Sequence, residues 1–233
     1  GTWLATGGDE GTVRIWDPAT ATQSATLTGH TGGVRAVAIS PDGTWLATSS
    51  FDSTVRIWDP ATATQSAALT GHTGGVSAVA ISPDGTWLAT SSFDSTVRIW
   101  DPVTATLTAT LTGHTGGVSA VAISPDGTWL AAGGDDGTVV RIWDPVTATL
   151  TATLTGHTGG VSAVAISPDG TWLAAAGGDD GTVRIWNTTT WQPAAMMRAD
   201  TAMTCCCWSA DGASIAIGGA NGLYHFRFHP GTL

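Results

Sequence analysis

Short apolar runs alternate with polar turns along nearly the whole chain, and the runs show no helical spacing. They are rich in Val, Ile, Trp and Thr, and the turns between them are built on Pro, Asp, Gly and Ser. Turn signals at intervals of about 8–12 residues are typical of an all-β protein. In one representative stretch the predicted strands cover residues 76–81, 87–90, 97–100 and 107–111.

This stretch is one copy of an internal repeat. Residues 31–72 and 73–114 differ at only a few positions, and looser copies follow at 115–157 and 158–200. A four-stranded copy cannot bury its own apolar faces, so the copies must share one core, which predicts a single domain over residues 1–233. Four strands per repeat of about 42 residues is the arrangement of a β-propeller blade. The repeat is marked by Trp16, Trp58, Trp100, Trp143 and Trp186.

Composition and charge narrow the class of partner. The net charge is −10, from 18 acidic residues against eight basic ones, all of them arginine. Nucleic-acid binding depends on clustered positive charge, so we expect no nucleic-acid partner. The sequence contains no apolar run of the roughly 18 residues that span a bilayer, so we expect no membrane partner.

Three adjacent cysteines, Cys205, Cys206 and Cys207, align with residues 163–165 of the preceding copy. Neighbouring residues of a strand point to opposite faces, and the sequence contains no second cysteine cluster that would complete a metal site. We therefore expect small core residues here. Unpaired thiols also predict a reducing environment and a cytoplasmic location.

Gly-His pairs at residues 29–30, 71–72, 113–114 and 156–157 are each followed by an SPDG turn and then by an Ile-Trp pair. This succession resembles the WD-repeat β-propeller family, in particular bacterial members with near-identical tandem repeats. The likeness runs from residue 1 to about residue 187. It implies four-stranded antiparallel blades with strands a to d from the axis outwards. Each copy then supplies the outer strand of one blade and the inner three strands of the next.

On that scheme about six blades are represented, the first lacking strand a and the last lacking strand d. The family closes its ring with an N-terminal strand, so we expect a natural chain that is longer at its N-terminus, with six or seven blades. The incomplete blades leave strand edges unpaired, which favours self-association. An inserted valine in the fourth copy predicts a bulge near Val139. The expected blades cover residues 1–28, 32–70, 74–112, 116–155, 159–197 and 201–229.

Histidine, hydroxyl, carboxylate and indole side chains return at fixed positions of the copies. The resemblance implies that they form a hydrogen-bonded network within a blade, in which Asp orients His, and His reaches Ser or Thr and then Trp. A buried imidazole or indole without a partner would cost about 1–3 kcal/mol. Gly134 and Gly178 stand at the serine position of two copies. The expected members are His30, Ser50, Asp52, Trp58, His72, Ser92, Asp94, Trp100, His114, Asp136, Trp143, His157, Asp180 and Trp186.

The same residue types could be read as a hydrolase triad. An active site needs one set of groups around one substrate, however, whereas this set returns copy after copy. We therefore expect no enzyme and no catalytic residue. The Asp-rich turns lack the spacing and the distal Glu of a calcium loop, and no Gly-rich phosphate loop opens a helix. We expect neither a metal nor a cofactor.

Function is expected on the face that carries the d–a and b–c loops, where the family usually binds its partners. Aromatic and arginine side chains are favoured in such contacts, which makes Phe51 and Phe93 the leading candidates. The paired glycines of the TGGV segments predict that the rest of this face is rather bare. The candidate partner surface comprises Arg35, Phe51, Phe93, Ser77, Ser119 and Ser162.

The sequence thus predicts a non-enzymatic scaffold or sensor module for protein partners. The resemblance further implies the C-terminal part of a larger bacterial signalling protein. The alternative is a glycan- or small-ligand-binding propeller with repeated sites between blades, lined by Trp45, Trp87, Trp129 and Trp172. Buried indoles would favour the scaffold, and indoles exposed in clefts between blades would favour the ligand-binding protein.

Overall fold

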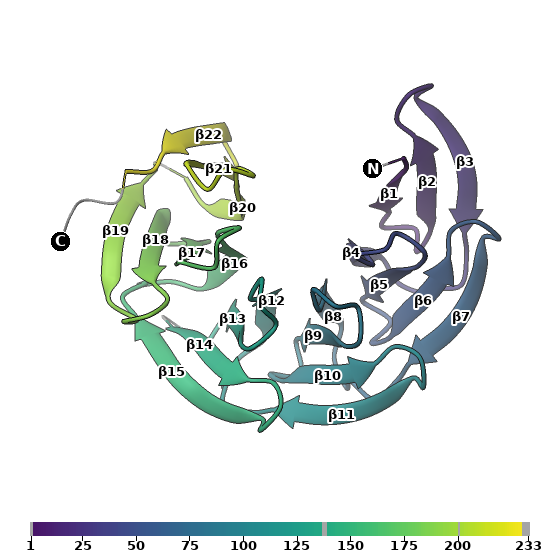
Figure 1. Cartoon of the computed structure of the whole chain (residues 1–233), viewed down its shortest axis with the longest axis horizontal. Coiled ribbons are helices and arrows are strands. Elements are labelled where there is room, and N and C mark those ends of the chain that lie inside the picture. The colour runs from purple at the N-terminus through teal and green to yellow at the C-terminus, as the bar shows by residue number, and fades with distance from the viewer. Residues whose placement is uncertain (1, 137–138, 200, 230–233) are drawn as a thin grey trace. The chain divides into compact units, whose positions relative to one another are not determined.

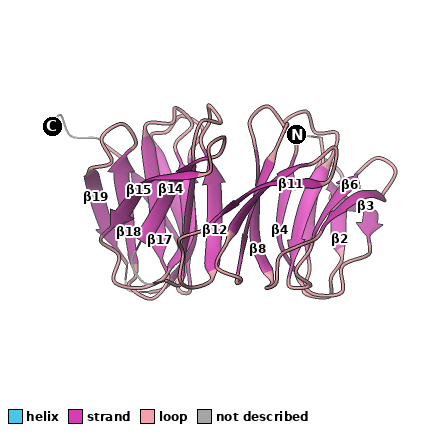
Figure 2. Cartoon of the chain, turned by 90° about the horizontal axis from the view of Figure 1, so that it is seen from below, coloured by secondary structure: helices cyan, strands magenta, loops and turns pink. Residues whose placement is uncertain are grey.

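The computed structural model describes residues 2–136, 139–199 and 201–229. Every regular element in these ranges is a β-strand, and the strands form six antiparallel sheets in chain order (Figures 1 and 2). The all-β prediction is confirmed. Within the same ranges no helix is long and apolar enough to cross a bilayer. The chain divides into two compact units, Gly1–Gly113 and His114–Leu233. That both belong to one domain stays a prediction.

The first unit holds sheets 1 to 3. The first strands of sheets 2 and 3, β4 (Val34–Ile39) and β8 (Val76–Ile81), lie side by side (Figure 1). Sheet 1 is β1 (Leu4–Gly7), β2 (Val13–Asp17) and β3 (Thr22–Leu27). Sheet 2 is β4 (Val34–Ile39), β5 (Leu46–Ser50), β6 (Val55–Asp59) and β7 (Thr64–Leu69). Sheet 3 is β8 (Val76–Ile81), β9 (Leu88–Ser92), β10 (Val97–Asp101) and β11 (Thr106–Leu111).

The second unit holds sheets 4 to 6. Sheet 4 is β12 (Val118–Ile123), β13 (Leu130–Gly134), β14 (Val139–Asp144) and β15 (Thr149–Thr155). Sheet 5 is β16 (Val161–Ile166), β17 (Trp172–Gly177), β18 (Thr182–Asn187) and β19 (Pro193–Arg198). Sheet 6 is β20 (Met203–Trp208), β21 (Ser214–Gly219) and β22 (Gly222–Arg227).

The antiparallel order sorts the turns of each four-stranded sheet to two ends of its strands, which Figure 2 shows in profile. The turns after the first and third strands lie at one end, which we call the PDG end after its Pro-Asp-Gly turns. The turn after the second strand and the links between sheets lie at the opposite end, which we call the linking end. At the PDG end, Gly43 has a φ of 72°. Glycine adopts this left-handed conformation without strain.

The core of each unit lies between adjacent sheets. Ile57 of sheet 2 packs with Val76, Leu88 and Trp100 of sheet 3, all of them buried. The second strands β5, β9 and β13 are buried at every position, which explains their small residues. Sheets therefore hold together by stacking their faces, as repeat units do.

The bulge predicted near Val139 is wrong for the described strand. The pairing of β13 with β14 joins Gly133 to Val140 and Ala132 to Arg141 without a shift. The register of β14 shifts against β15 only between Ile142 and Trp143, the place where sheets 1, 2, 3 and 5 also shift. Residues 137–138, which directly precede Val139, lie outside the described part of the chain.

Of the three cysteines, only Cys206 packs as the core residue that the sequence predicts. Cys205 and Cys207 are exposed, whereas Cys206 points to the opposite face of β20 and packs against the core of the second unit. Burial raises the pKa of the Cys206 thiol to about 12, so this thiol stays protonated. The alternation of a strand explains the split, because it places the first and third cysteines on one face.

Candidate interaction surface and its supporting network

A chain of hydrogen bonds links the indole of sheet 2 to a carboxylate at the linking end. Trp58 Nε1 donates to Thr48 Oγ1 at 2.8 Å, and Thr48 Oγ1 lies 2.8 Å from His30 Nε2. On the other side of the ring, His30 Nδ1 lies 2.8 Å from Asp52 Oδ2. Sheet 3 repeats the chain through Trp100, Thr90, His72 and Asp94, with distances of 2.8, 2.8 and 2.7 Å.

The partners determine where the protons lie. The Asp52 carboxylate only accepts, so His30 Nδ1 carries the proton and donates it. The remaining ring nitrogen then accepts from the Thr48 hydroxyl, whose lone pairs accept from the indole. Every group in the chain is satisfied with a neutral imidazole. The His30 side chain has no exposed surface, so the resemblance to a hydrolase triad does not extend to a group that could contact a substrate.

The structure places the sequence-predicted serines outside this chain. Ser50 donates to the Gly32 carbonyl at 2.8 Å and accepts from the Asp52 N–H, so it shapes the turn instead of contacting His30. Ser92 does the same with the Gly74 carbonyl in sheet 3. The hydroxyl beside the indole belongs to Thr48 or Thr90, which the sequence analysis missed. The sequence did contain a sign of this role, because both threonines stand at a position where the later copies have alanine.

Sheets 4 and 5 keep the histidine, the carboxylate and the indole but lack the threonine. His114 Nδ1 lies 2.9 Å from Asp136 Oδ2, and His157 Nδ1 lies 2.9 Å from Asp180 Oδ2. Alanine stands at the threonine position, and among the described residues Nε2 of each histidine has no hydrogen-bond partner. The serine position of sheet 5 is Gly177, and not Gly178 as the sequence analysis expected. Gly177 pairs with Val161 in the same way as Ser92 pairs with Val76 in sheet 3.

Burial controls the protonation of these groups. It lowers the pKa of His30, His72, His114 and His157, and the neighbouring carboxylate opposes this only in part. Burial alone would raise the pKa of Asp52. Hydrogen bonds from Thr54, the Thr31 N–H and His30 outweigh it and lower the pKa to about 2. The pair is thus a neutral imidazole beside an ionised carboxylate.

The network holds the turn that carries the aromatic candidate Phe51. Asp52 accepts from the Thr31 N–H at 2.9 Å, which joins this turn to the link before β4. The Phe51 N–H donates to the Gly33 carbonyl at 3.0 Å, a second tie to the same link. The position of Phe51 on the surface is therefore determined on both sides by the buried network.

Three of the candidate surface residues meet at the linking end of the first unit. The Arg35 guanidinium lies 4.6 Å from the centre of the Phe51 ring, within the range of a cation–π contact. The Phe51 and Phe93 rings lie 6.0 Å apart and almost parallel, at 14°. Both rings are nearly half exposed, at 47% and 44%. They form an apolar step with a cation at one side.

Gly75 makes room for this step. A Cβ on Gly75 would lie 2.8 Å from Cδ1 of Phe51 and 3.5 Å from Phe93. Any larger residue would therefore push the Phe51 ring away. The glycine pair serves the surface by leaving space for the phenylalanines.

The remaining candidates do not gather. Ser77 lies on β8 of the first unit, and its hydroxyl is buried with no described partner. Ser119 lies 3.5 Å from Asp135 at the linking end of sheet 4. Ser162 lies beside Gly178 in sheet 5. In the second unit, small and acidic residues thus stand where the first unit has phenylalanine.

Comparison with known protein families agrees with this geometry. The WD domain, G-beta repeat, matches residues 1–17, 21–59, 63–101, 105–144 and 148–187, which together exceed half of the chain. A comparison with curated proteins found no match. WD repeats generally mediate protein–protein interaction, and proteins built from them are typically non-enzymatic scaffolds. The chain belongs to the WD-repeat family.

Proposed function

We propose that this chain is a protein-interaction module whose contact surface is the Arg35–Phe51–Phe93 step at the linking end of the first unit. Stacked aromatic rings beside an arginine are the residue types that dominate binding energy at protein interfaces. The single observation that carries the proposal is the half-exposed pair Phe51–Phe93, held in place from below by buried hydrogen bonds.

The step offers two kinds of contact. The phenylalanine rings can bury an apolar side chain of the partner. The Arg35 guanidinium stacks on one of these rings, and such a guanidinium keeps its N–H edge for an acceptor. Because the turns are already ordered, binding would lose little conformational freedom.

We further propose the wider context that the repeats suggest, a sensor or scaffold part of a larger bacterial signalling protein in the cytoplasm. Near-identical copies support this because they resemble bacterial propellers of that type. The buried histidines support a non-enzymatic role, since their side chains are 0–1% exposed. The six sheets would act as a rigid support for the loops.

The test is a selection of displayed random peptides against the chain, followed by affinity measurement on the double variant Phe51→Asp/Phe93→Asp. Aspartate is the natural residue at the equivalent turn of sheet 4, so the turn tolerates it. We expect selected peptides to bind the variant at least about 30-fold more weakly, the loss of a hot spot of roughly 2 kcal/mol.

A matched control removes exposed apolar side chains elsewhere. Val103 and Val146 are 90% and 91% exposed in turns at the PDG end. The double variant Val103→Asp/Val146→Asp should bind the same peptides as well as the wild type does. Peptides that bind the phenylalanine variant with unchanged affinity would contradict the proposal.

A further inference from the structure

Two clefts open at the PDG end of the first unit, at the opposite end of the strands from the phenylalanine step. One lies between sheets 1 and 2 with a volume of about 460 Å³, and the other between sheets 2 and 3 with about 330 Å³. Each has a half-buried indole in its wall, Trp3 in the first cleft and Trp45 in the second. Both volumes suit a small ligand or a single long side chain.

The two clefts are copies of one construction. Trp3, Ile15 and Ser24 line the first, and the residues 42 positions later, Trp45, Ile57 and Ser66, line the second. The facing wall follows the same rule, since Pro60 in the first cleft corresponds to Pro102 in the second. The repeat has thus produced the same apolar slot twice within one unit.

Asp59 lies on the ridge between the two clefts and lines both. Its Oδ1 accepts from the N–H groups of Ala61 at 2.8 Å and Thr62 at 3.2 Å. These bonds lower the pKa of the carboxyl, so Asp59 carries a negative charge at neutral pH. The structure shows no hydrogen bond from a described residue to its Oδ2, so this oxygen is available to a ligand in either cleft.

The hydroxyl groups of the clefts already donate their hydrogen bonds to acceptors within the protein. Ser24 donates to the Ile15 carbonyl, and Ser66 donates to the Ile57 carbonyl. Thr44, which lines both clefts, donates to Asp42. What these hydroxyls still offer is lone pairs. Apart from the indole N–H, the side chains of both clefts present hydrogen-bond acceptors.

An acceptor-lined slot with an indole wall and a carboxylate at its rim selects a cation that donates hydrogen bonds. The face of an indole is negative and attracts guanidinium or ammonium groups. The apolar walls would cover the methylene stem of a long side chain while its charged head reaches Asp59. We propose that these clefts bind arginine side chains of a basic peptide segment.

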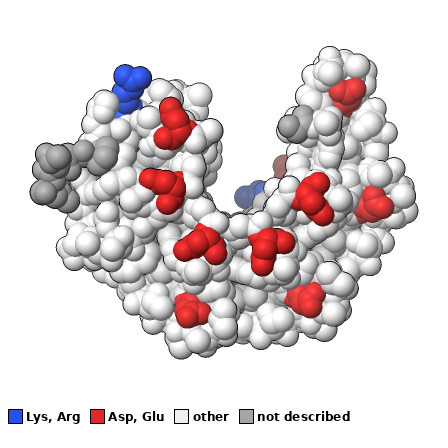
Figure 3. Space-filling view, in the orientation of Figure 1, with Lys and Arg blue, Asp and Glu red and all other residues white. Residues whose placement is uncertain are grey.

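The charge of the protein favours the same ligand. The chain carries a net charge of −10, and acidic groups are spread over the displayed face of the first unit (Figure 3). A cationic peptide is therefore attracted before it reaches the clefts. An anionic ligand would meet repulsion, and a neutral one would not use the carboxylate.

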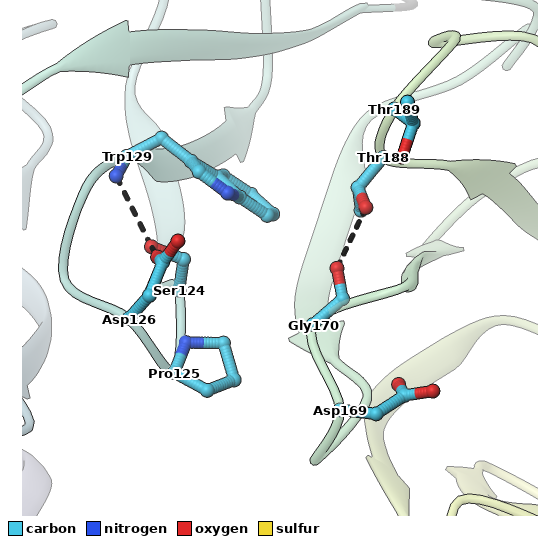
Figure 4. Close-up of a pocket in the computed structure, with 8 residues that line it drawn as sticks. All are labelled: Ser124, Pro125, Asp126, Trp129, Asp169, Gly170, Thr188 and Thr189. Carbon is cyan, nitrogen blue, oxygen red and sulfur yellow. Dashed lines mark hydrogen bonds between the residues drawn. The ribbon is translucent and has the colours of Figure 1, made fainter.

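The second unit has a cleft of about 430 Å³ at the matching place, and it is built differently (Figure 4). Its carboxylates, Asp126 and Asp169, belong to Pro-Asp-Gly turns and already accept hydrogen bonds within them. Thr188 donates to the Gly170 carbonyl at 2.6 Å. The indole of Trp129 packs edge-on against Trp191 at 5.3 Å, which covers part of its surface. We therefore assign the arginine site to the first unit.

The test uses the blocked peptide acetyl-(Arg-Gly)₄-amide and follows the indole N–H resonances by NMR. The Trp3→Phe and Trp45→Phe variants assign the two signals. We expect both signals to shift saturably with the arginine peptide. The peptide with citrulline in place of arginine keeps the shape but loses the charge, and it should bind at least about tenfold more weakly.

Asp59→Asn is the decisive variant, and asparagine is safe there because Asn187 caps the same turn of sheet 5. We expect it to weaken arginine-peptide binding about tenfold or more. Asp17→Asn is the matched control. It removes the same charge from the same turn of sheet 1, where Asp17 caps Ala19 at 2.8 Å and lines neither cleft. It should change the affinity less than twofold.

Equal weakening by the two variants would overturn the proposal, because it would reveal only long-range attraction. Shifts of the same indoles by maltotetraose, unaffected by Asp59→Asn, would also overturn it in favour of a glycan site. The Phe51→Asp/Phe93→Asp variant should bind the arginine peptide normally. The outcome therefore does not depend on the proposed function of the phenylalanine step.

Discussion

Sheets 2 and 3 differ from sheets 4 and 5 at the buried position beside the histidine. All four bury a histidine paired with an aspartate and pack a tryptophan ring about 6 Å from the imidazole. Thr48 and Thr90 complete the hydrogen-bonded chain in the first unit, whereas Ala132 and Ala175 interrupt it in the second. The histidine, aspartate and tryptophan of the motif therefore do not determine whether the hydrogen-bonded chain is complete. The threonine or alanine between them, which is not part of the motif, determines it.

The presence or absence of this threonine changes how many buried polar groups have a hydrogen-bond partner. In sheets 2 and 3 the threonine accepts from the indole and donates to the imidazole, so both of these groups have a partner. In sheets 4 and 5 each Nε2 lacks a described partner, which costs about 1–3 kcal/mol. In sheet 4, Arg141 offsets some of this cost with an ion pair to Asp136 at 2.6 Å. The surface above follows the same division, with phenylalanine in the first unit and aspartate or glycine in the second.

The largest expected effect is the conversion of sheet 3 to the pattern of sheet 4. Thr90→Ala should lower the free energy of unfolding by about 2 kcal/mol, because it leaves both the indole N–H and His72 Nε2 without a partner. Urea unfolding followed by tryptophan fluorescence measures the change.

Ser91→Ala is the control for that variant. Ser91 is the next residue in β9, equally buried, and its hydroxyl has no partner among the described residues. Its removal should change stability by less than about 0.5 kcal/mol, or should stabilise, since an unpaired buried hydroxyl is costly. If the two variants lost the same stability, packing and not the hydrogen-bonded chain would explain the difference between the sheets.

The reverse conversion should give a smaller effect of opposite sign. Ala132→Thr places a hydroxyl between His114 and the indole of sheet 4, and should raise the free energy of unfolding by about 1 kcal/mol. Urea unfolding again provides the measurement. Ala131→Thr, at the neighbouring fully buried position on the other face of β13, should destabilise by overpacking. Destabilisation by both variants would show that sheet 4 has no room for the bridge.

The smallest effect is a pH dependence that both kinds of sheet share. Because burial lowers the pKa of the four histidines below 6.5, the unfolded chain takes up protons first as the pH falls. Stability should therefore decrease as the pH is lowered through 6.5, and decrease further below 3.8 as Asp94, with a pKa of about 2, loses its advantage.

Urea midpoints at pH 7.5 and 5.5 measure the first part of this dependence. Thr90→Ala should keep the same direction of change, because burial of the imidazole, the main cause, is common to both patterns. A urea midpoint that rose on acidification would mean that the carboxylates hold the histidines protonated. It would contradict the neutral imidazole described for sheets 2 and 3.

Repetition made most of the fold predictable from the sequence. The turn residues located the four strands of the representative copy to within about two residues, and each copy repeats the same local signals. Pairing of the histidines with Asp52, Asp94, Asp136 and Asp180 follows the positions read from the sequence.

Distances across the sheets decided the rest. Thr48 and Ser50 point to the same side of β5, but two residues of strand separate them by about 6.6 Å, so only one can meet the indole of Trp58. The pattern of apolar and polar positions is identical for both choices. Likewise, the local sequence around Gly75 does not show that it lies under Phe51, 24 residues earlier, because that contact joins turns of two sheets. The sequence by itself determined the strands and the order of their turns, whereas only the packed structure decided which side chains meet between them.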